Sequence, residues 1–178
     1  YNGMKMVKAG SAPIGSADGM AAIKLLAESG KFSSKKAGGK LIDASETRVD
    51  YVEKLMEFID VAALRPLKVL VNAGNGAAGP SFDALAAALA KASAPIDFIR
   101  IHHVPDGSFP LGIPNPLLKE NQHLTAVPVV SHGADMGVAW DGDFDRCFFF
   151  DHEGGFIAGE YAVVLLAEAF LNKEPGQK

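Results

Sequence analysis

The middle of this sequence alternates between strand-like and helix-like segments, and this alternation constrains the possible fold most strongly. Leu67–Asn72 is a continuous apolar run, which is typical of a strand buried on both faces. It is followed by an Ala/Leu-rich helical segment at 82–92, a strand pattern at 96–102, a helical pattern at 117–131 and an apolar strand at 136–140. Because such an order indicates an α/β unit with parallel strands, we expect an α/β fold with a mixed, mostly parallel sheet and flanking helices.

Further segments flank this unit on both sides. A helical pattern before it stops at Gly30, and a Gly-, Ser- and Lys-rich loop then marks the best candidate for a domain boundary. Inside the unit, Pro128 is expected to kink or split the helix over 117–131. Other predicted elements include helices over 17–29, 45–60 and 160–172 and a strand over 147–151, with the boundary loop over 31–40.

Composition excludes several classes of protein. The 17 Lys and Arg against 21 Asp and Glu give a net charge of −4, and no basic cluster is denser than Lys35-Lys36, so nucleic acid is not an expected partner. The single cysteine, Cys147, excludes an internal disulfide framework, and a reducing cytoplasm is the expected compartment. Every uncharged apolar run is too short for a membrane-spanning helix, so no membrane partner is expected.

The two ends of the sequence are unusual. The chain starts at Tyr1 without a methionine or a signal-peptide pattern, and residues 172–178 read as a helix end that runs into a turn. Together they favour a piece of a longer chain, which the intact mass of the native protein would test.

A glycine-rich turn at 74–79 matches the G-x-G-x-x-G pattern of dinucleotide sites. It lies between a strand and a helix, as that motif requires, but an acidic residue is missing from the end of the next strand. Asp97 lies near the start of that strand, and His102 and His103 lie at its end. We therefore interpret the motif as a tight turn that needs glycine for its backbone angles.

An acidic loop after the third strand carries the most specific signal. Asp141, Asp143 and Asp145 alternate with other residues, and in an extended segment their side chains would point the same way. Three such carboxylates repel one another, and a hard divalent cation with oxygen ligands is the simplest partner that would stabilise them. Mg²⁺ fits best, with water or substrate phosphate as further ligands, and Arg146 adds a planar donor group suited to phosphate or carboxylate.

Other interpretations of this loop meet the spacing less well. An EF-hand that began at Asp141 would need Gly and Glu where Arg146 and His152 stand. A haloacid-dehalogenase-like phosphatase would use Asp141 as its nucleophile, but its loop normally continues to a Thr or Val that is absent here. An acidic turn without a ligand is costly between two apolar strands.

The stretch over 133–146 closely resembles the magnesium loop of the α-D-phosphohexomutases, within which it is similar to the bacterial phosphomannomutase/phosphoglucomutase branch. That loop commonly reads D-G-D-G-D-R or D-G-D-F-D-R, and this chain has the second form. Further similar runs occur in family order. They lie at 1–5, 72–79, 105–110 and 114–116.

This resemblance implies a domain arrangement and a reaction. Residues 1–44 would be the tail of the family's domain 1, residues 45–153 its domain 2 with the magnesium loop, and residues 154–178 the first helix of its domain 3. Family enzymes interconvert hexose 1-phosphates and hexose 6-phosphates. A phosphoserine gives its phosphoryl group to the sugar, and the bisphosphorylated intermediate reorients and returns the other one. Positioning and charge neutralisation carry most of such catalysis.

The resemblance also assigns residue roles. Asp141, Asp143 and Asp145 would be Mg²⁺ ligands, Arg146 would face the phosphate site, and Lys5 would assist proton transfer or charge stabilisation. The family's Ser-His-Asn-Pro loop does not occur in this sequence, so the chain alone is expected to be inactive as a mutase. The sugar preference, between mannose and glucose phosphates among others, stays open.

The sequence also leaves an alternative function open and raises the question of self-association. The alternative function is a stand-alone divalent-metal-binding α/β module without catalysis. The apolar helix over 160–171 would lack its own domain in this chain, so self-association through exposed apolar surface is a further expectation.

Overall fold

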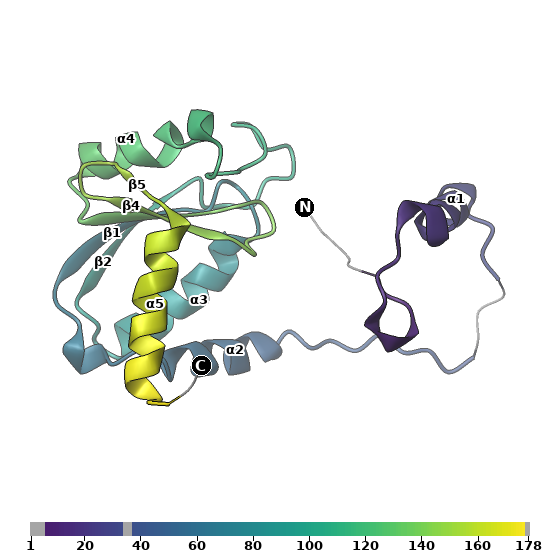
Figure 1. Cartoon of the computed structure of the whole chain (residues 1–178), viewed down its shortest axis with the longest axis horizontal. Helices are drawn as coiled ribbons and strands as arrows, with labels where there is room; N and C mark the ends of the chain where they lie inside the picture. Colours follow the sequence, from purple (N-terminus) through teal and green to yellow (C-terminus); the bar gives the residue numbers. More distant parts are fainter. Residues whose placement is uncertain (1–5, 34–36, 177–178) are drawn as a thin grey trace. The chain divides into compact units, whose positions relative to one another are not determined.

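The computed structural model describes residues 6–33 and 37–176, and the chain divides into two compact units with the boundary between Ser45 and Glu46 (Figure 1). Among the described residues, no helix combines the length and the apolar character that crossing a membrane requires.

In the described part of the first unit, the 3₁₀ turns Ala9–Ser11 and Ser16–Asp18 precede the α-helix α1 (Met20–Ser29). The predicted start of this helix at residue 17 falls in the second of these turns. Gly30 ends α1 as expected, because it adopts a left-handed conformation with φ of 63°. None of the described residues of this unit is buried.

The second unit is built around a five-stranded sheet with the order β2-β1-β3-β4-β5. The central strand β1 pairs in parallel with β2 and β3, whereas β4 and β5 extend the sheet in antiparallel fashion. This arrangement confirms a mixed sheet with flanking helices. The elements are α2 (Thr47–Met56), β1 (Leu67–Asn72), α3 (Ala78–Lys91), β2 (Ile96–Ile101), α4 (His123–His132), β3 (Met136–Trp140), β4 (Cys147–Asp151), β5 (Phe156–Ile157) and α5 (Gly159–Lys173), with 3₁₀ turns at Val61–Ala63 and Lys119–Asn121.

Helices α3 and α4 cover opposite faces of this sheet (Figure 1). On one face Val69 and Val71 of β1 pack with Phe82 of α3. On the other face Leu70 packs with Val129 of α4 and other apolar side chains. Alternate residues of β1 therefore face two separate cores, which explains why the strand is apolar throughout.

The chain reverses its direction across the sheet at β1. The connection through α3 leads from β1 to the outer strand β2, and the connection through α4 leads from β2 to β3, on the other side of β1. The chain thus leaves β1 toward β2 and leaves β3 toward β4, so the two connections diverge at the boundary between β1 and β3. Open α/β sheets place ligands outside the carboxyl ends of the strands at such a point. The loop at 141–146 leaves the carboxyl end of β3 there.

Pro128 does not split α4, which is one helix from His123 to His132. A proline lacks the N–H that would bond to the carbonyl four residues earlier, and here that carbonyl belongs to Leu124. The Asn72 side chain, at the end of β1, donates to the Leu124 carbonyl at 3.3 Å and to the Thr125 hydroxyl at 2.9 Å. A side chain from the neighbouring strand thus satisfies the acceptor that the proline leaves open.

Candidate metal centre

The acidic loop joins two antiparallel strands. Trp140 at the end of β3 pairs with Cys147 at the start of β4, and the six residues between them form the loop. Within it the N–H of Phe144 donates to the carbonyl of Asp141 at 3.1 Å. The segment is therefore a turn and not the extended stretch on which the sequence argument relied, and the turn is what brings the carboxylates together.

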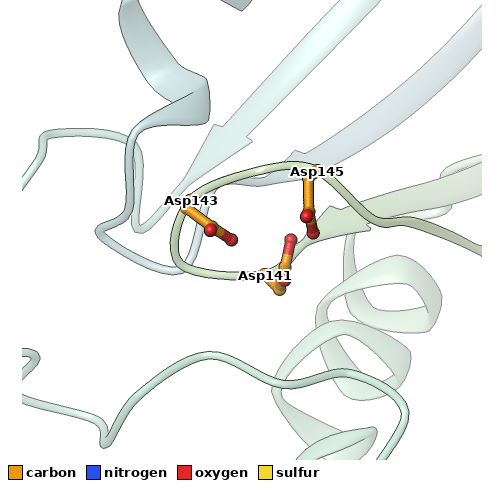
Figure 2. Close-up of side chains that lie close together, drawn as sticks. All are labelled: Asp141, Asp143 and Asp145. Atoms are coloured by element: carbon orange, nitrogen blue, oxygen red, sulfur yellow. The ribbon is translucent and has the colours of Figure 1, made fainter. Parts of the chain in front are cut away.

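Asp141, Asp143 and Asp145 each offer a carboxylate oxygen, and these oxygens lie within 4.8 Å of one another. Figure 2 shows the three side chains turned toward one another across the loop. Asp141 is buried, with 1% of its surface exposed, whereas Asp143 and Asp145 are exposed. The cluster thus has one fixed member and two members at the surface.

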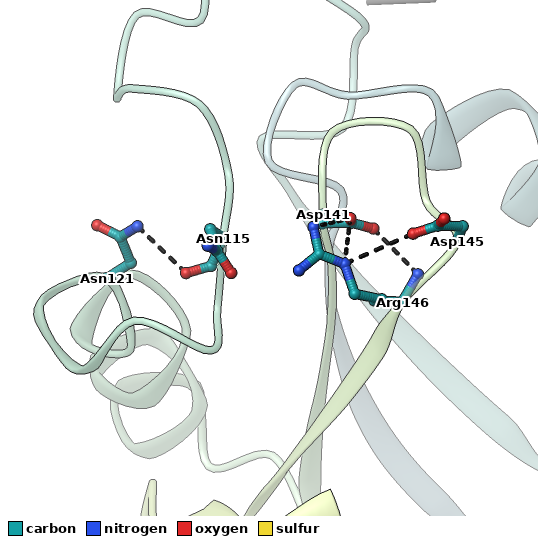
Figure 3. A network of polar contacts seen from close by, with 5 residues as sticks. All are labelled: Asn115, Asn121, Asp141, Asp145 and Arg146. Atoms are coloured by element: carbon teal, nitrogen blue, oxygen red, sulfur yellow. Dashed lines mark hydrogen bonds and ion pairs between the residues drawn. The ribbon is translucent and has the colours of Figure 1, made fainter. Parts of the chain in front are cut away.

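Arg146 lies directly against this cluster (Figure 3). Its backbone N–H donates to Asp141 Oδ1 at 3.0 Å, and its Nε and Nη2 lie 2.7 and 2.6 Å from Asp141 Oδ2. Its Nε is also 3.5 Å from Asp145 Oδ1. The hydrogen bond and charge of Asp141, with smaller contributions from the neighbouring carboxylates, raise the pKa of the Arg146 guanidinium.

The glycine-rich turn after β1 packs against the backbone of the acidic loop. The N–H of Ala77 donates to the carbonyl of Gly142 at 3.0 Å. A Cβ on Gly76 would lie 2.6 Å from that same carbonyl oxygen, so no larger residue fits without movement. Gly74 adopts a φ of 56°, and a Cβ on Gly79 would lie 2.1 Å from the His103 carbonyl oxygen. Backbone angle and close packing together explain the three glycines.

Sequence reasoning missed two residues at this site. Asn115 lines a depression together with the three aspartates, and its buried Oδ1 has no hydrogen-bond partner among the described residues. Its carbonyl accepts from Asn121 Nδ2 at 3.2 Å (Figure 3). Phe144 lies between two of the aspartates with a φ of 50°. Neither has a local sequence signal for these features. Lys5, the other predicted catalytic residue, lies outside the described residues.

The donor set fits a hard divalent cation. All three side chains offer oxygen atoms, which Mg²⁺ and Ca²⁺ prefer. Adjacent ligand oxygens around Mg²⁺ are about 2.9 Å apart and opposite ones about 4.2 Å, given bonds of roughly 2.0–2.1 Å. A small inward movement of the two exposed side chains would bring the oxygens from their 4.8 Å limit into this range. An EF-hand is excluded, because strand β4 starts directly after the loop.

These features agree with one class of proteins, the phosphohexomutases. The family described as "Phosphoglucomutase/phosphomannomutase, alpha/beta/alpha domain II" matches residues 49–155, and the chain belongs to the phosphoglucomutase/phosphomannomutase family. This confirms the resemblance inferred from the acidic loop, and the haloacid-dehalogenase-like alternative is set aside.

Particular relatives are named phosphomannomutase. The chain is 53% identical over 180 residues to the phosphomannomutase of Salmonella montevideo and 49% identical over 182 residues to that of Escherichia coli. Both alignments cover 100% of this chain, which spans 39% and 40% of the length of these two relatives.

Solved structures agree with the fold. A phosphoglucomutase/phosphomannomutase family protein from Burkholderia thailandensis superimposes with a TM-score of 0.66 at 28% identity, over 88% of this chain and 32% of that protein. A phosphomannomutase from Thermus thermophilus, described as putative, has the same fold at 21% identity, with a TM-score of 0.65 over 94% of this chain and 37% of that one.

Proposed function

We propose that this chain supplies the divalent-cation loop of a phosphohexomutase that interconverts hexose 1-phosphate and hexose 6-phosphate through a phosphoserine and a bisphosphorylated sugar. The observation that supports it most is the cluster of three carboxylates at the switch point of the sheet. The mannose and glucose phosphates are the proposed substrates, in line with the names of the relatives.

In this proposal Asp141, Asp143 and Asp145 hold Mg²⁺. When bound, the ion supplies neutralisation of the negative charge that builds up during phosphoryl transfer. The buried Asp141 holds the guanidinium of Arg146 beside the cluster, where its remaining donors can bind a substrate phosphate. Lys5 assists proton transfer or charge stabilisation.

The chain is proposed to work as part of a longer enzyme, since it spans about two fifths of the length of its relatives. The phosphoryl-carrying serine would come from outside this sequence, which contains no Ser-His-Asn-Pro. A coupled mutase assay with the chain alone, a hexose 1-phosphate and a hexose bisphosphate should therefore read zero. Measurable turnover would contradict this division of labour.

Cation binding is the direct test of the loop. Electron paramagnetic resonance of Mn²⁺ measures the free ion, and competition then gives the affinity for Mg²⁺. The wild-type chain should bind one equivalent, and Asp143→Asn should weaken binding about tenfold or more, because a ligand is lost. Asp50→Asn is the matched control, since Asp50 is an exposed aspartate on α2 outside the loop. Equal binding by all three proteins, or none, would refute the proposed site.

Self-association of the isolated chain is the second part of the proposal. Helix α5 has no buried residue, and Val163, Leu166 and Phe170 are each more than half exposed. Contiguous apolar surface of this kind favours contacts between copies. Sedimentation velocity should show an apparent mass that rises with concentration, and Leu166→Glu should reduce this rise. A monomer at all concentrations would contradict self-association.

A further inference from the structure

The backbone of Phe144 adopts a conformation that is unfavourable for its residue type. Its φ of 50° lies in the left-handed region, which a bulky residue rarely enters because its Cβ approaches the backbone too closely. The residue also completes the turn of the acidic loop, through its N–H bond to the Asp141 carbonyl at 3.1 Å. A conformation of this cost persists only where surrounding contacts hold it.

Phe144 borders an apolar depression outside the loop. It is half-buried and lines an apolar depression together with Tyr51 and Leu55 of α2, Leu85 of α3 and Trp140 of β3. Burial of an aromatic ring against apolar neighbours is favourable, because it removes a large area from water. The residue at the tip of the acidic loop thus shares a depression with two helices that are remote from it in sequence.

We infer that Phe144 is a positioning residue for the cation: its ring, seated beside α2 and α3, fixes the turn that presents Asp143 and Asp145. The inference rests on the proposed cation site. The Phe144 side chain has no atom that could bind a cation, and its effect passes through the two exposed carboxylates on either side of it.

This role has a consequence that depends on the ion. Mg²⁺ requires near-ideal octahedral geometry with short bonds, whereas Ca²⁺ accepts six to eight oxygens in flexible arrangements. A loop tip that has lost its anchor can still surround Ca²⁺ but meets the stricter geometry of Mg²⁺ less often. Loss of the ring should therefore reduce the preference for Mg²⁺ over Ca²⁺ in addition to overall affinity.

The test compares Phe144→Ala and Phe144→Leu with the wild-type chain. Bound Mn²⁺ is measured by electron paramagnetic resonance, Mg²⁺ and Ca²⁺ affinities by competition, and stability by thermal unfolding without cation. Phe98→Ala is the matched control, because Phe98 is also half-buried but lies on β2, edge-on to Phe82 at 5.0 Å between ring centroids. It should lower the melting temperature without weakening cation binding.

Phe144→Ala should weaken Mg²⁺ binding about tenfold, the effect typical of residues that orient metal ligands, and Ca²⁺ binding by roughly threefold or less. Phe144→Leu should restore most of the Mg²⁺ affinity, since it keeps an apolar side chain in the depression. Wild-type affinities in Phe144→Ala would overturn this inference alone. A wild-type chain that binds no cation would overturn the proposed cation site and this inference with it.

Discussion

Asp141 combines burial and charge in a way that the other two carboxylates of the loop do not. It is almost fully enclosed, and both of its oxygens accept hydrogen bonds from Arg146. Asp143 and Asp145 are exposed. Asp141 therefore has a structural part in the loop besides its proposed part as a ligand.

Substitution of these aspartates should separate the two parts. Asp141→Asn removes the charge of a buried carboxylate from its pair with the half-exposed Arg146, and it should lower the free energy of unfolding by about 1–3 kcal/mol, as well as cation affinity. Asp143→Asn should lower cation affinity with a change in stability of about 0.5 kcal/mol or less, as is usual at exposed positions. Chemical denaturation without cation measures the first effect, and equal stability of both variants would contradict the structural part.

Asp83 predicts a dependence of stability on pH. Burial raises its pKa, but His103 and Arg100, each with a nitrogen 3.0 Å from its carboxylate, outweigh this and hold the pKa below its ordinary value of 3.8. Because the unfolded chain takes up the proton first as pH falls, the stability from this carboxylate is present above about pH 4 and is lost as pH drops through the lowered folded-state pKa.

The comparison of Asp83→Asn with the wild type isolates this contribution. The difference in unfolding free energy between them should shrink as pH falls below 3.8. Denaturant titrations over this range measure it. A difference that stays constant down to pH 2 or so would mean that Asp83 contributes no pH-dependent stability.

The sequence predicted the candidate ligands of the site because they lie in one short loop. Asp141, Asp143, Asp145 and Arg146 needed only their spacing and their place after a strand, and the structure brings them together. The supporting contacts could not be predicted in this way. Phe144 lines a depression with helices from distant parts of the chain, so no local pattern identified its surroundings.

At the scale of elements, the glycine-rich turn after β1 and the acidic loop after β3 are in direct backbone contact. The Ala77–Gly142 hydrogen bond and the close approach at Gly76 hold the two backbones together. The glycines that matched a nucleotide-binding pattern in the sequence are thus explained by the close packing of this turn against the acidic loop.

Gly76→Ala should disturb this contact between the two loops. Its Cβ would lie 2.6 Å from the Gly142 carbonyl oxygen, and the loop must shift to accept it. We expect a loss of about 1–3 kcal/mol in unfolding free energy from overpacking, and a weaker cation affinity by about tenfold. The control is Gly107→Ala, where a Cβ meets nothing within 4 Å. Denaturation measures the stability, and Mn²⁺ titration measures the cation affinity. A Gly76→Ala variant as stable and as tightly binding as the control would refute the claim that the glycine-rich turn supports the acidic loop.

Strands were easier to predict than helix ends. The bounds of β1, β3 and β4 agree with the sequence pattern, because uniform apolar runs define buried strands. The predicted helix over 117–131 begins only at His123, since a 3₁₀ turn at Lys119–Asn121 precedes it. Strand β5 was missed because two residues carry no period, and only its pairing with β4 makes it a strand.

At the scale of the whole molecule, the two units differ in how far they are stabilised by burial. The first has no buried residue among those described, and the second has a core on each face of its sheet. Helix α5 adds nothing to either core, because none of its residues is buried. The stability measured for this chain should therefore report mainly on the sheet and on α3 and α4.

The parallel pairing of β1 with β3 has a consequence for the time course of folding. At its start the N–H of Lys68 donates to the carboxylate of Asp135, 67 residues further along the chain. Contacts across such a separation require closure of a long loop before they are stabilised, and they tend to form slowly. The acidic loop, which follows β3, should then take shape only after the rate-limiting step.

A divalent cation should in that case act on one rate constant only. Interactions absent from the transition state slow unfolding and leave refolding unchanged. At a cation concentration about 100 times Kd, the stabilisation of about 2.7 kcal/mol would slow unfolding roughly a hundredfold. Stopped-flow refolding and unfolding with and without Mg²⁺ would measure both arms, and a faster refolding arm would show that the loop forms early. For a chain with this topology, the ion would slow the unfolding of the folded protein without accelerating its folding.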